Sequence, residues 1–220
     1  ETDLIAGGYW FKHLGDSKFE ANQIDNYGMS RAAAGDLIEG GRPEIVLGSG
    51  DGVAPLNLYQ WVDGKWEKTT LIPIVDHGHT LQVADINLDG HLDIYTAEMY
   101  RPGPLDKCKQ WILYGDGQGN FDKQVLTVGM GTHEGKLGDI DGDGDIDIVT
   151  ARSWDLGPLQ LWRNTISETG VSGKVGVGAL PPRGADVLID GTRGLLNRKW
   201  TYWKGPRFSS SLPIKWKLVD

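Results

Sequence analysis

A short acidic segment, residues 139–147, constrains the fold of this chain more than any other feature. It reads DIDGDGDID, with Asp at positions 1, 3, 5, 7 and 9 and Gly144 at position 6. Carboxylates at alternate positions of a tight loop converge on one point and repel one another unless a cation lies there. Calcium takes six to eight oxygen ligands at about 2.3–2.6 Å, which suits such a loop. A set of Asx-turns is the alternative, but it explains one or two of these acids rather than all of them.

The pattern occurs a second time at residues 85–93, which read DINLDGHLD. Asn87 replaces one carboxylate with an amide oxygen, and Gly90 again occupies position 6. We expect one calcium ion in each loop, held by the side chains of positions 1, 3, 5 and 9 and by the carbonyl of position 7. The expected ligands are the side chains of Asp85, Asn87, Asp89, Asp93, Asp139, Asp141, Asp143 and Asp147, and the carbonyl groups of His91 and Asp145.

The residues around these loops distinguish them from an EF-hand. An EF-hand lies between helices and carries a bidentate Glu at position 12. Position 12 is Thr96 in one copy and Thr150 in the other. The flanking segments are short and rich in β-branched residues, as in LDIYTA and IDIVTA, which predicts strands. Each loop therefore joins two strands.

The loop and its strands belong to a repeat. A degenerate copy at residues 36–44 keeps acids at positions 1 and 9 but has Ile38 and Gly40 at positions 3 and 5, so we expect no calcium there. The three copies start at residues 36, 85 and 139, which is a spacing typical of propellers and solenoids. The first residues, DLIAGGYW, resemble the second strand of a still earlier copy.

Each repeat also has a second half that predicts a hairpin. Residues 110–126 surround the Gly-rich turn GDGQGN, and residues 56–71 turn at Asp63 and Gly64. Together with the strands around the loop, this makes four antiparallel strands, the size of one β-propeller blade. We expect an all-β fold of about three and a half blades, part of a larger propeller, with a short C-terminal β segment.

The two acidic loops, the strands LDIYTAE and IDIVTAR and the turn GDGQGNF resemble the FG-GAP/VCBS repeat family of calcium-binding β-propellers. That family is related to integrin α-subunit heads and to some fungal and bacterial lectins. The resemblance covers about residues 1–165 and implies propeller blades with bound calcium. It does not select an activity, because one fold hosts many functions.

Charge is distributed unevenly along the chain. The net charge is −8, yet residues 171–220 contain nine Lys or Arg and three Asp. Such a break indicates a module boundary, and the acidic remainder argues against nucleic acid as a partner. We assign a linker to residues 166–183 and a partial β-sandwich-like module to residues 184–220. The segments LIDG and WKLVD in that module resemble the opening strands of the 3-keto-disaccharide hydrolase family; a strand pair that docks on the propeller is the alternative.

Several features bear on location. Calcium loops of this kind fill readily where calcium is millimolar, which favours an extracellular or periplasmic protein. The single cysteine, Cys108, excludes an intrachain disulfide, and no apolar run is long enough to span a membrane. The chain begins inside a repeat, so we expect it to be part of a longer polypeptide.

Polar residues recur at a fixed distance before the loops. His79 and His133 each lie six residues before the first residue of a loop, Asp85 or Asp139. Arg31 and Glu134 lie five residues before Asp36 and Asp139, and Lys136 lies three residues before Asp139. Equivalent points of adjacent blades meet near the central channel. We therefore expect these five residues to share one pocket, for binding or catalysis.

Carbohydrate is the ligand class that this set suggests first. A sugar-binding surface would add a stacking aromatic such as Tyr100 or Trp154. A polysaccharide lyase or glycoside-cleaving enzyme would use one histidine as the base and Lys136 or Arg31 to hold a uronate carboxylate. We interpret the chain as a secreted, calcium-stabilised propeller that binds or processes a polysaccharide or other glycan.

Three other interpretations remain open from the sequence. The period of a strand would place His77 on the face of His79, so that both could bind zinc with His133. An integrin-like module for protein–protein adhesion is a second possibility. In the third, the polar residues only hydrogen-bond across blades and fill the channel.

Overall fold

The computed structural model describes residues 2–100, 107–153 and 156–167. The module expected at residues 184–220, nearly all of the linker before it, and Trp154 lie outside this range. The chain divides into two units. The first comprises Glu1–Gly138 and Asp145–Ile166, and the second comprises Asp139–Gly144 and Ser167–Asp220. Every regular element that the structure describes is a β-strand. In the described part of the chain, no helix has the length and apolar character needed to cross a bilayer.

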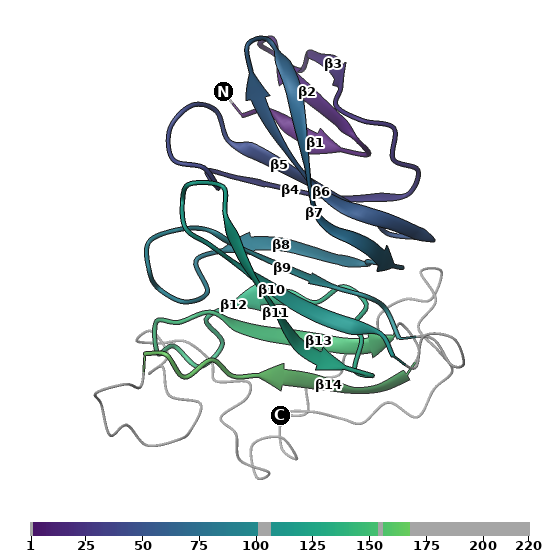
Figure 1. Ribbon diagram of the computed structural model, residues 1–220, viewed down its shortest axis with the longest axis vertical. Helices are drawn as coiled ribbons and strands as arrows, with labels where there is room; N and C mark the ends of the chain where they lie inside the picture. The colour runs from purple at the N-terminus through teal and green to yellow at the C-terminus, as the bar shows by residue number, and fades with distance from the viewer. Residues whose placement is uncertain (1, 101–106, 154–155, 168–220) are drawn as a thin grey trace, which may run out of the picture. The chain divides into compact units, whose positions relative to one another are not determined.

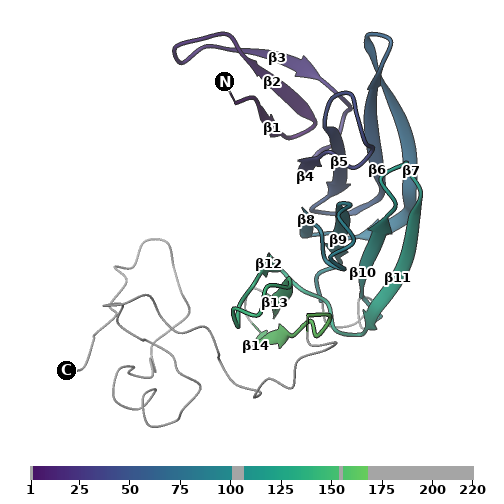
Figure 2. The same ribbon diagram turned by 90° about the vertical axis from the view of Figure 1, so that its left-hand side faces the viewer.

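The strands form four antiparallel sheets, and all four belong to the first unit (Figures 1 and 2). The first sheet contains β1 (Leu4–Ala6), β2 (Tyr9–His13) and β3 (Phe19–Gln23), and the second contains β4 (Ser30–Gly35), β5 (Glu44–Ser49), β6 (Val53–Val62) and β7 (Lys65–Asp76). The third contains β8 (Thr80–Ala84), β9 (Asp93–Ala97), β10 (Lys109–Gly115) and β11 (Phe121–Val128). The fourth contains β12 (Lys136–Gly138), β13 (Asp147–Ser153) and β14 (Leu156–Trp162).

Within each sheet, strands that are consecutive in sequence are neighbours in space. The second and third sheets have the four strands expected of a propeller blade, whereas the first and fourth have three within the described residues. The first strands of successive sheets, β4, β8 and β12, contact one another in turn. The all-β prediction and the repeating antiparallel sheet are confirmed, although the described sheets do not close into a ring.

The first sheet corresponds to the last three strands of a four-stranded sheet. Asp3, just before β1, accepts a hydrogen bond from the backbone amide of His13 at the end of β2 (2.8 Å). Asp93, at the start of β9, accepts the equivalent bond from Gly115 at the end of β10 (2.9 Å). The same bond joins β13 to the residues after β14. β1 is thus the counterpart of β9, in agreement with the likeness of the first residues to a second strand.

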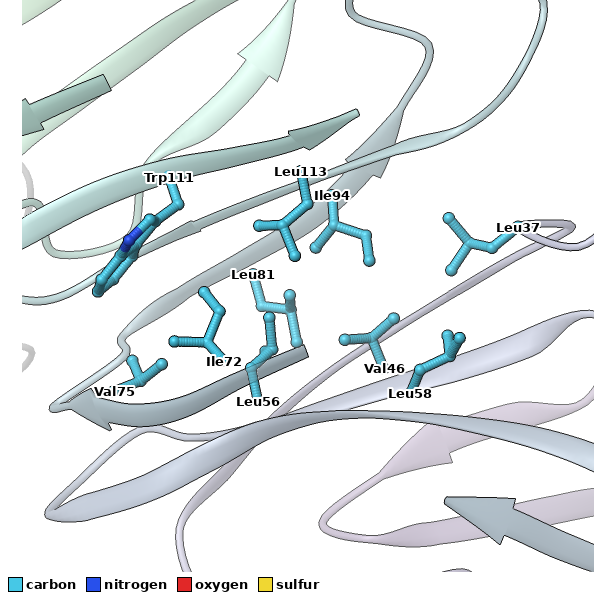
Figure 3. Close-up of a cluster of buried hydrophobic side chains, with 10 residues drawn as sticks. All are labelled: Leu37, Val46, Leu56, Leu58, Ile72, Val75, Leu81, Ile94, Trp111 and Leu113. Carbon is cyan, nitrogen blue, oxygen red and sulfur yellow. The ribbon is translucent and has the colours of Figure 1, made fainter. Parts of the chain in front are cut away.

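Apolar side chains hold the sheets together face to face. Strands β5 and β9 are buried along their whole length, including the acids Glu44 and Asp93 at their first positions. The largest cluster lies between the second and third sheets, and Figure 3 shows side chains from both sheets meeting there. Its members are Leu37, Val46, Leu56, Leu58, Ile72, Val75, Leu81, Ile94, Trp111 and Leu113. Smaller clusters join the first sheet to the second and the third sheet to the fourth.

Candidate functional site

The loop at residues 85–93 joins β8 to β9, so it lies between strands as predicted. The Asp85 carboxylate accepts hydrogen bonds from the backbone amides of Asp89 (3.2 Å) and Gly90 (2.9 Å). The side-chain amide of Asn87 donates to Asp89 (2.8 Å), so the side chains of positions 1, 3 and 5 gather at one end of the loop. A hydrogen bond from the His91 amide to the Asp89 carboxylate holds the pKa of Asp89 below its usual value.

Asp93, the acid at position 9, is fully buried and has a structural task of its own. One of its oxygens accepts the amides of Ile86 (2.8 Å) and Asn87 (3.3 Å), and the other accepts the amide of Gly115 (2.9 Å). Burial raises the pKa of this carboxyl group, while the three amide donors act in the opposite direction. A carboxylate has about four lone-pair sites, so three are used before any cation is considered.

The segment Asp139–Gly144 has the same internal bonding as the first loop. Asp139 accepts hydrogen bonds from the amides of Asp143 (3.1 Å) and Gly144 (3.2 Å), which are positions 5 and 6. Gly144 and Gly90 both have a positive φ, 95° and 92°, a conformation that glycine adopts most readily. Two loops of different sequence therefore close in the same way.

The two later residues of that motif lie in the first unit. Asp145 and Asp147 are both fully buried. Asp147 accepts a hydrogen bond from the amide of Asn164 (2.8 Å), so it is the counterpart of Asp93 in the fourth sheet. Sequence analysis treated position 9 as a calcium ligand only and did not reveal this second task.

The loop at residues 36–44 keeps the buried acid of position 9 and the glycine of position 6, but it has no oxygen donor in its side chains at positions 3 and 5. Glu44, at position 9, is buried and accepts the amides of Leu37 (3.0 Å) and Ile38 (2.9 Å), as Asp93 does in its own loop. Gly41, at position 6, has a φ of 89°. Burial raises the pKa of Glu44.

The five polar residues expected to share a pocket lie close together, on β4, on β12 and in the segments just before β8 and β12. Arg31 on β4 is the centre of the group. Its guanidinium donates to the carboxylate of Glu134 (2.5 Å), to the backbone carbonyl of His79 (2.9 Å) and to Nδ1 of His79 (3.2 Å). Lys136 on β12 lies 3.7 Å from the other oxygen of Glu134. Arg31, His79, His133, Glu134 and Lys136 are called the Arg31 cluster below.

His79 uses both of its ring nitrogens inside this group. Its Nδ1 faces the Arg31 guanidinium, and its Nε2 lies 3.0 Å from a carboxylate oxygen of Asp51. The arrangement requires Nδ1 to accept and Nε2–H to donate, and the side chain is only 11% exposed. Asp51 lies in the turn between β5 and β6, and sequence analysis did not single it out, because a Gly-Asp-Gly turn is common in any hairpin.

His133 is the second histidine of the Arg31 cluster. Its ring centre lies 4.6 Å from that of His79, with the planes inclined by 32°. Burial, and then the neighbouring His79, lower the pKa of His133, so the ring is neutral at pH 7. The backbone amide of His133 donates to the carbonyl of Ala151 (2.7 Å), which fixes this segment against β13.

His77 does not join the other two histidines. It has a positive φ of 53° and follows the end of β7, so the strand period that would align it with His79 does not apply. Its Nδ1 lies 2.5 Å from a carboxylate oxygen of Asp76. Potential ligand atoms of His79, His133 and Glu134 do lie within 4.8 Å of one another. However, the Arg31 guanidinium occupies the space between His79 and Glu134, where a metal would have to bind.

One family model matches this chain. The FG-GAP-like repeat matches residues 36–96. The match begins at the first residue of the degenerate loop, includes β5 to β8 and the loop at residues 85–93, and ends within β9. No curated protein matches the chain significantly. The match and the antiparallel sheets together indicate a β-propeller-type module, and FG-GAP repeats are typical of extracellular proteins.

Proposed function

We propose that this chain is a secreted, calcium-stabilised β-propeller-type module that binds a carbohydrate. The observation that carries the calcium part is the repeated closure of residues 85–90 and 139–144. In both segments, the carboxylate of position 1 bonds the amides of positions 5 and 6. In the first loop, the side-chain amide of position 3 also bonds the carboxylate of position 5 (2.8 Å).

Calcium fits the donor set of these loops. All the side-chain donors expected at positions 1, 3, 5 and 9 are carboxylate or amide oxygens, which a hard cation prefers. Neither loop contains Lys or Arg to balance its acids. Bound calcium would supply that balance, and it would brace the turn between the first two strands of the third and fourth sheets.

Isothermal titration with calcium tests this part of the proposal. We expect two sites per chain, one site in Asp89→Ala, and no change in Asp36→Ala, which alters the degenerate loop. Magnesium should bind far more weakly, because it demands a near-ideal octahedral shell and keeps several waters. Two sites that survive Asp89→Ala would contradict the assignment, as would a chain that binds no calcium.

The carbohydrate part rests on the Arg31 cluster. Three sheets place two cations, two histidines and an acid in one group, and Lys136 keeps 64% of its side chain exposed. An exposed ammonium beside hydrogen-bonding groups suits an acidic sugar. The neutral His133 would also suit proton abstraction beside a uronate carboxylate, whereas His79 is held by Arg31 and Asp51. A lyase is therefore the second candidate, with His133 as its base; an adhesion module that binds a protein is the third.

Binding and turnover of oligosaccharides separate these candidates. Acidic and neutral oligosaccharides are offered to the wild type and to a His133→Ala/Lys136→Ala double variant. A binding module loses affinity in the variant and forms no product in the wild type. A lyase forms an unsaturated uronate, visible by its ultraviolet absorbance, and loses that activity in His133→Ala. Equal binding by both proteins would mean that the Arg31 cluster only joins the sheets.

A further inference from the structure

A hollow of about 500 Å³ lies between the first and second sheets, and none of its lining residues belongs to the loop at residues 85–93 or to the Arg31 cluster. Its size falls in the range of small-molecule sites, roughly 300–1,000 Å³. Trp10 and Lys12 line it from β2, Trp66 lines it from β7, and Arg42 lines it from the degenerate loop. Asp3 is also at its rim.

Tryptophan side chains form one wall of the hollow. Trp10 lies 6.4 Å from Trp66 between ring centres, and Trp61, the cross-strand partner of Trp66, lies 6.2 Å from Trp10. The rings meet edge to face, and each is partly exposed. A partly exposed Trp offers an apolar surface with a polar edge, which suits a ligand that is itself amphipathic.

Two cations at the hollow form no ion pair with an acid among the described residues. The Arg42 guanidinium lies over the rings of Trp10 and Trp61, 5.8 and 5.3 Å from their centres, and both Arg42 and Lys12 are exposed. Neither forms an ion pair within the part of the chain that the structure describes. The Asp3 carboxylate at the rim interacts electrostatically with Lys12 and offsets part of this charge, so Arg42 is the main cation that the hollow offers to a ligand.

Asp3 does not supply the missing partner. Its carboxylate accepts hydrogen bonds from the backbone amide of His13 (2.8 Å) and from Nε1 of Trp10 (2.8 Å). These bonds fix Asp3 against the sheet and orient the Trp10 ring at the wall of the hollow. They leave Arg42 and Lys12 as the charged groups available to a ligand.

The degenerate loop, which carries Arg42, follows a different backbone path from the loop at residues 85–93. Arg42 is at position 7 of that loop, and the glycines at positions 5 and 6 both have a positive φ, 85° and 89°. The loop at residues 85–93 instead has its positive φ values at positions 4 and 6. The degenerate loop has lost the acids that would hold a cation, follows a different backbone path, and presents a cation to two tryptophans.

We infer that this hollow binds a saccharide that carries a carboxylate, such as a uronate. The sugar ring would lie against Trp10 and Trp66, whose apolar faces suit the C–H side of a pyranose. Arg42 would hold the carboxylate with its planar fork of donors, assisted by the charge of Lys12. This site is separate from the Arg31 cluster, and it stands whether or not that cluster binds a ligand.

Calorimetric titration with trigalacturonic acid tests the inference, with neutral galactotriose and sodium acetate as comparison ligands. The acidic trisaccharide should bind the wild type at least tenfold more tightly than the neutral one, and acetate alone should not bind measurably. Arg42→Gln should weaken binding at least tenfold, and Arg42→Lys should recover part of it. Trp66→Ala should weaken binding of the sugar by a similar factor.

Two control variants locate the binding. Lys65→Ala removes an exposed cation beside Trp66 that pairs with Glu67 and does not line the hollow, and it should bind as the wild type does. In the His133→Ala/Lys136→Ala variant, the part of the binding that Arg42→Gln removes should remain, which distinguishes this site from one at the Arg31 cluster. Wild-type binding that is absent, equal for both trisaccharides or unchanged in Arg42→Gln overturns the inference and leaves Arg42 as packing over the tryptophans. A melting temperature for each variant confirms that it is folded.

Discussion

The loops at residues 36–44 and 85–93 show which parts of this repeat build the sheet and which suit a metal. Both join the first two strands of a four-stranded sheet, and both have a glycine of positive φ at position 6. Both end in a buried acid, Glu44 or Asp93, that accepts the amides of positions 2 and 3. These shared features are the frame of the loop.

The two loops differ where a cation would bind. Positions 3 and 5 are Ile38 and Gly40 in one loop and Asn87 and Asp89 in the other. Ile38 packs against the cluster between the second and third sheets and pairs with Gln118 in a single β-bridge, so apolar burial takes the place of an oxygen ligand. A repeat can thus form its sheet without oxygen donors at positions 3 and 5 while it keeps the glycine of position 6 and the buried acid of position 9.

Calcium removal should have the largest effect, because it separates the two kinds of loop. A ligand that binds only the folded form adds RT ln(1 + [L]/Kd), about 2.7 kcal/mol per site at a hundredfold excess. We expect excess chelator to lower the urea midpoint of the wild type, and Asp89→Ala and Asp143→Ala each to abolish part of that shift. The measurement is urea unfolding with calcium and with chelator.

Asp36→Ala is the matched control for that experiment. It removes the position 1 acid of the degenerate loop, and its response to chelator should equal that of the wild type. A reduced response in Asp36→Ala, or an unchanged unfolding curve for the wild type in chelator, would contradict the proposed difference between the two kinds of loop.

Much of the fold can be predicted from the sequence, because the frame residues are local and repeat. The acidic loops, their β-branched flanks and the Gly-rich turns fix where strands begin and end, and DLIAGGYW places β1 as a second strand. Long-range pairing was harder to see. The members of the Arg31 cluster could be grouped because they lie at similar distances before the loops. Asp51 and the tryptophan hollow depend on how hairpins twist toward neighbouring sheets, and no short sequence motif indicates that twist. His77 was misplaced because a positive φ interrupts the strand period there.

Substitutions at position 9 should have the second-largest effect on stability. In Asp93, both oxygens are engaged by amide donors, so Asp93→Asn turns an NH₂ group toward Gly115 or toward Ile86 and Asn87. Leaving such buried donors unpaired costs about 1–3 kcal/mol. In Glu44, Oε1 has no partner within the described residues, so Glu44→Gln can keep the bonds to Leu37 and Ile38.

Glu44→Gln should therefore cost less stability than Asp93→Asn at pH 7, and its pH dependence checks the reason. Burial raises the pKa of Glu44 above the reference value of 4.5, so the folded form holds the proton more tightly than the unfolded form. That contribution to stability is present below pH 4.5 and is lost as pH rises through the raised pKa. Glu44→Gln should flatten this fall, as measured by urea unfolding from pH 4 to pH 7 in chelator. Equal losses in Asp93→Asn and Glu44→Gln would contradict the difference between the loops.

Position 6 gives a smaller effect that the two loops should share. Gly41 and Gly90 have φ values of 89° and 92°, and a Cβ at either position would meet no atom within 4 Å. Substitution by Ala then costs only backbone strain, about 1–2 kcal/mol. In chelator, Gly41→Ala and Gly90→Ala should lose similar stability. In calcium, Gly90→Ala should lose more, because the strained loop also binds the ion less well. A loss confined to one variant in chelator would mean that the glycines have different tasks.

The contact between the two loops should have the smallest effect. Glu39 of the degenerate loop lies 3.3 Å from the His91 ring, and its side chain is 72% exposed. Exposed pairs contribute about 0.2–1 kcal/mol, and salt screens them. The amide of Glu39 also donates to the carbonyl of Gly117 (2.8 Å), a bond that no side-chain change removes. A double-mutant cycle of Glu39→Gln and His91→Asn, measured by urea unfolding in chelator, isolates the side-chain part. If the contact is an ion pair, the coupling should shrink in 0.5 M salt. Coupling that is unchanged in 0.5 M salt would show that the two side chains interact by packing or neutral hydrogen bonding rather than by charge.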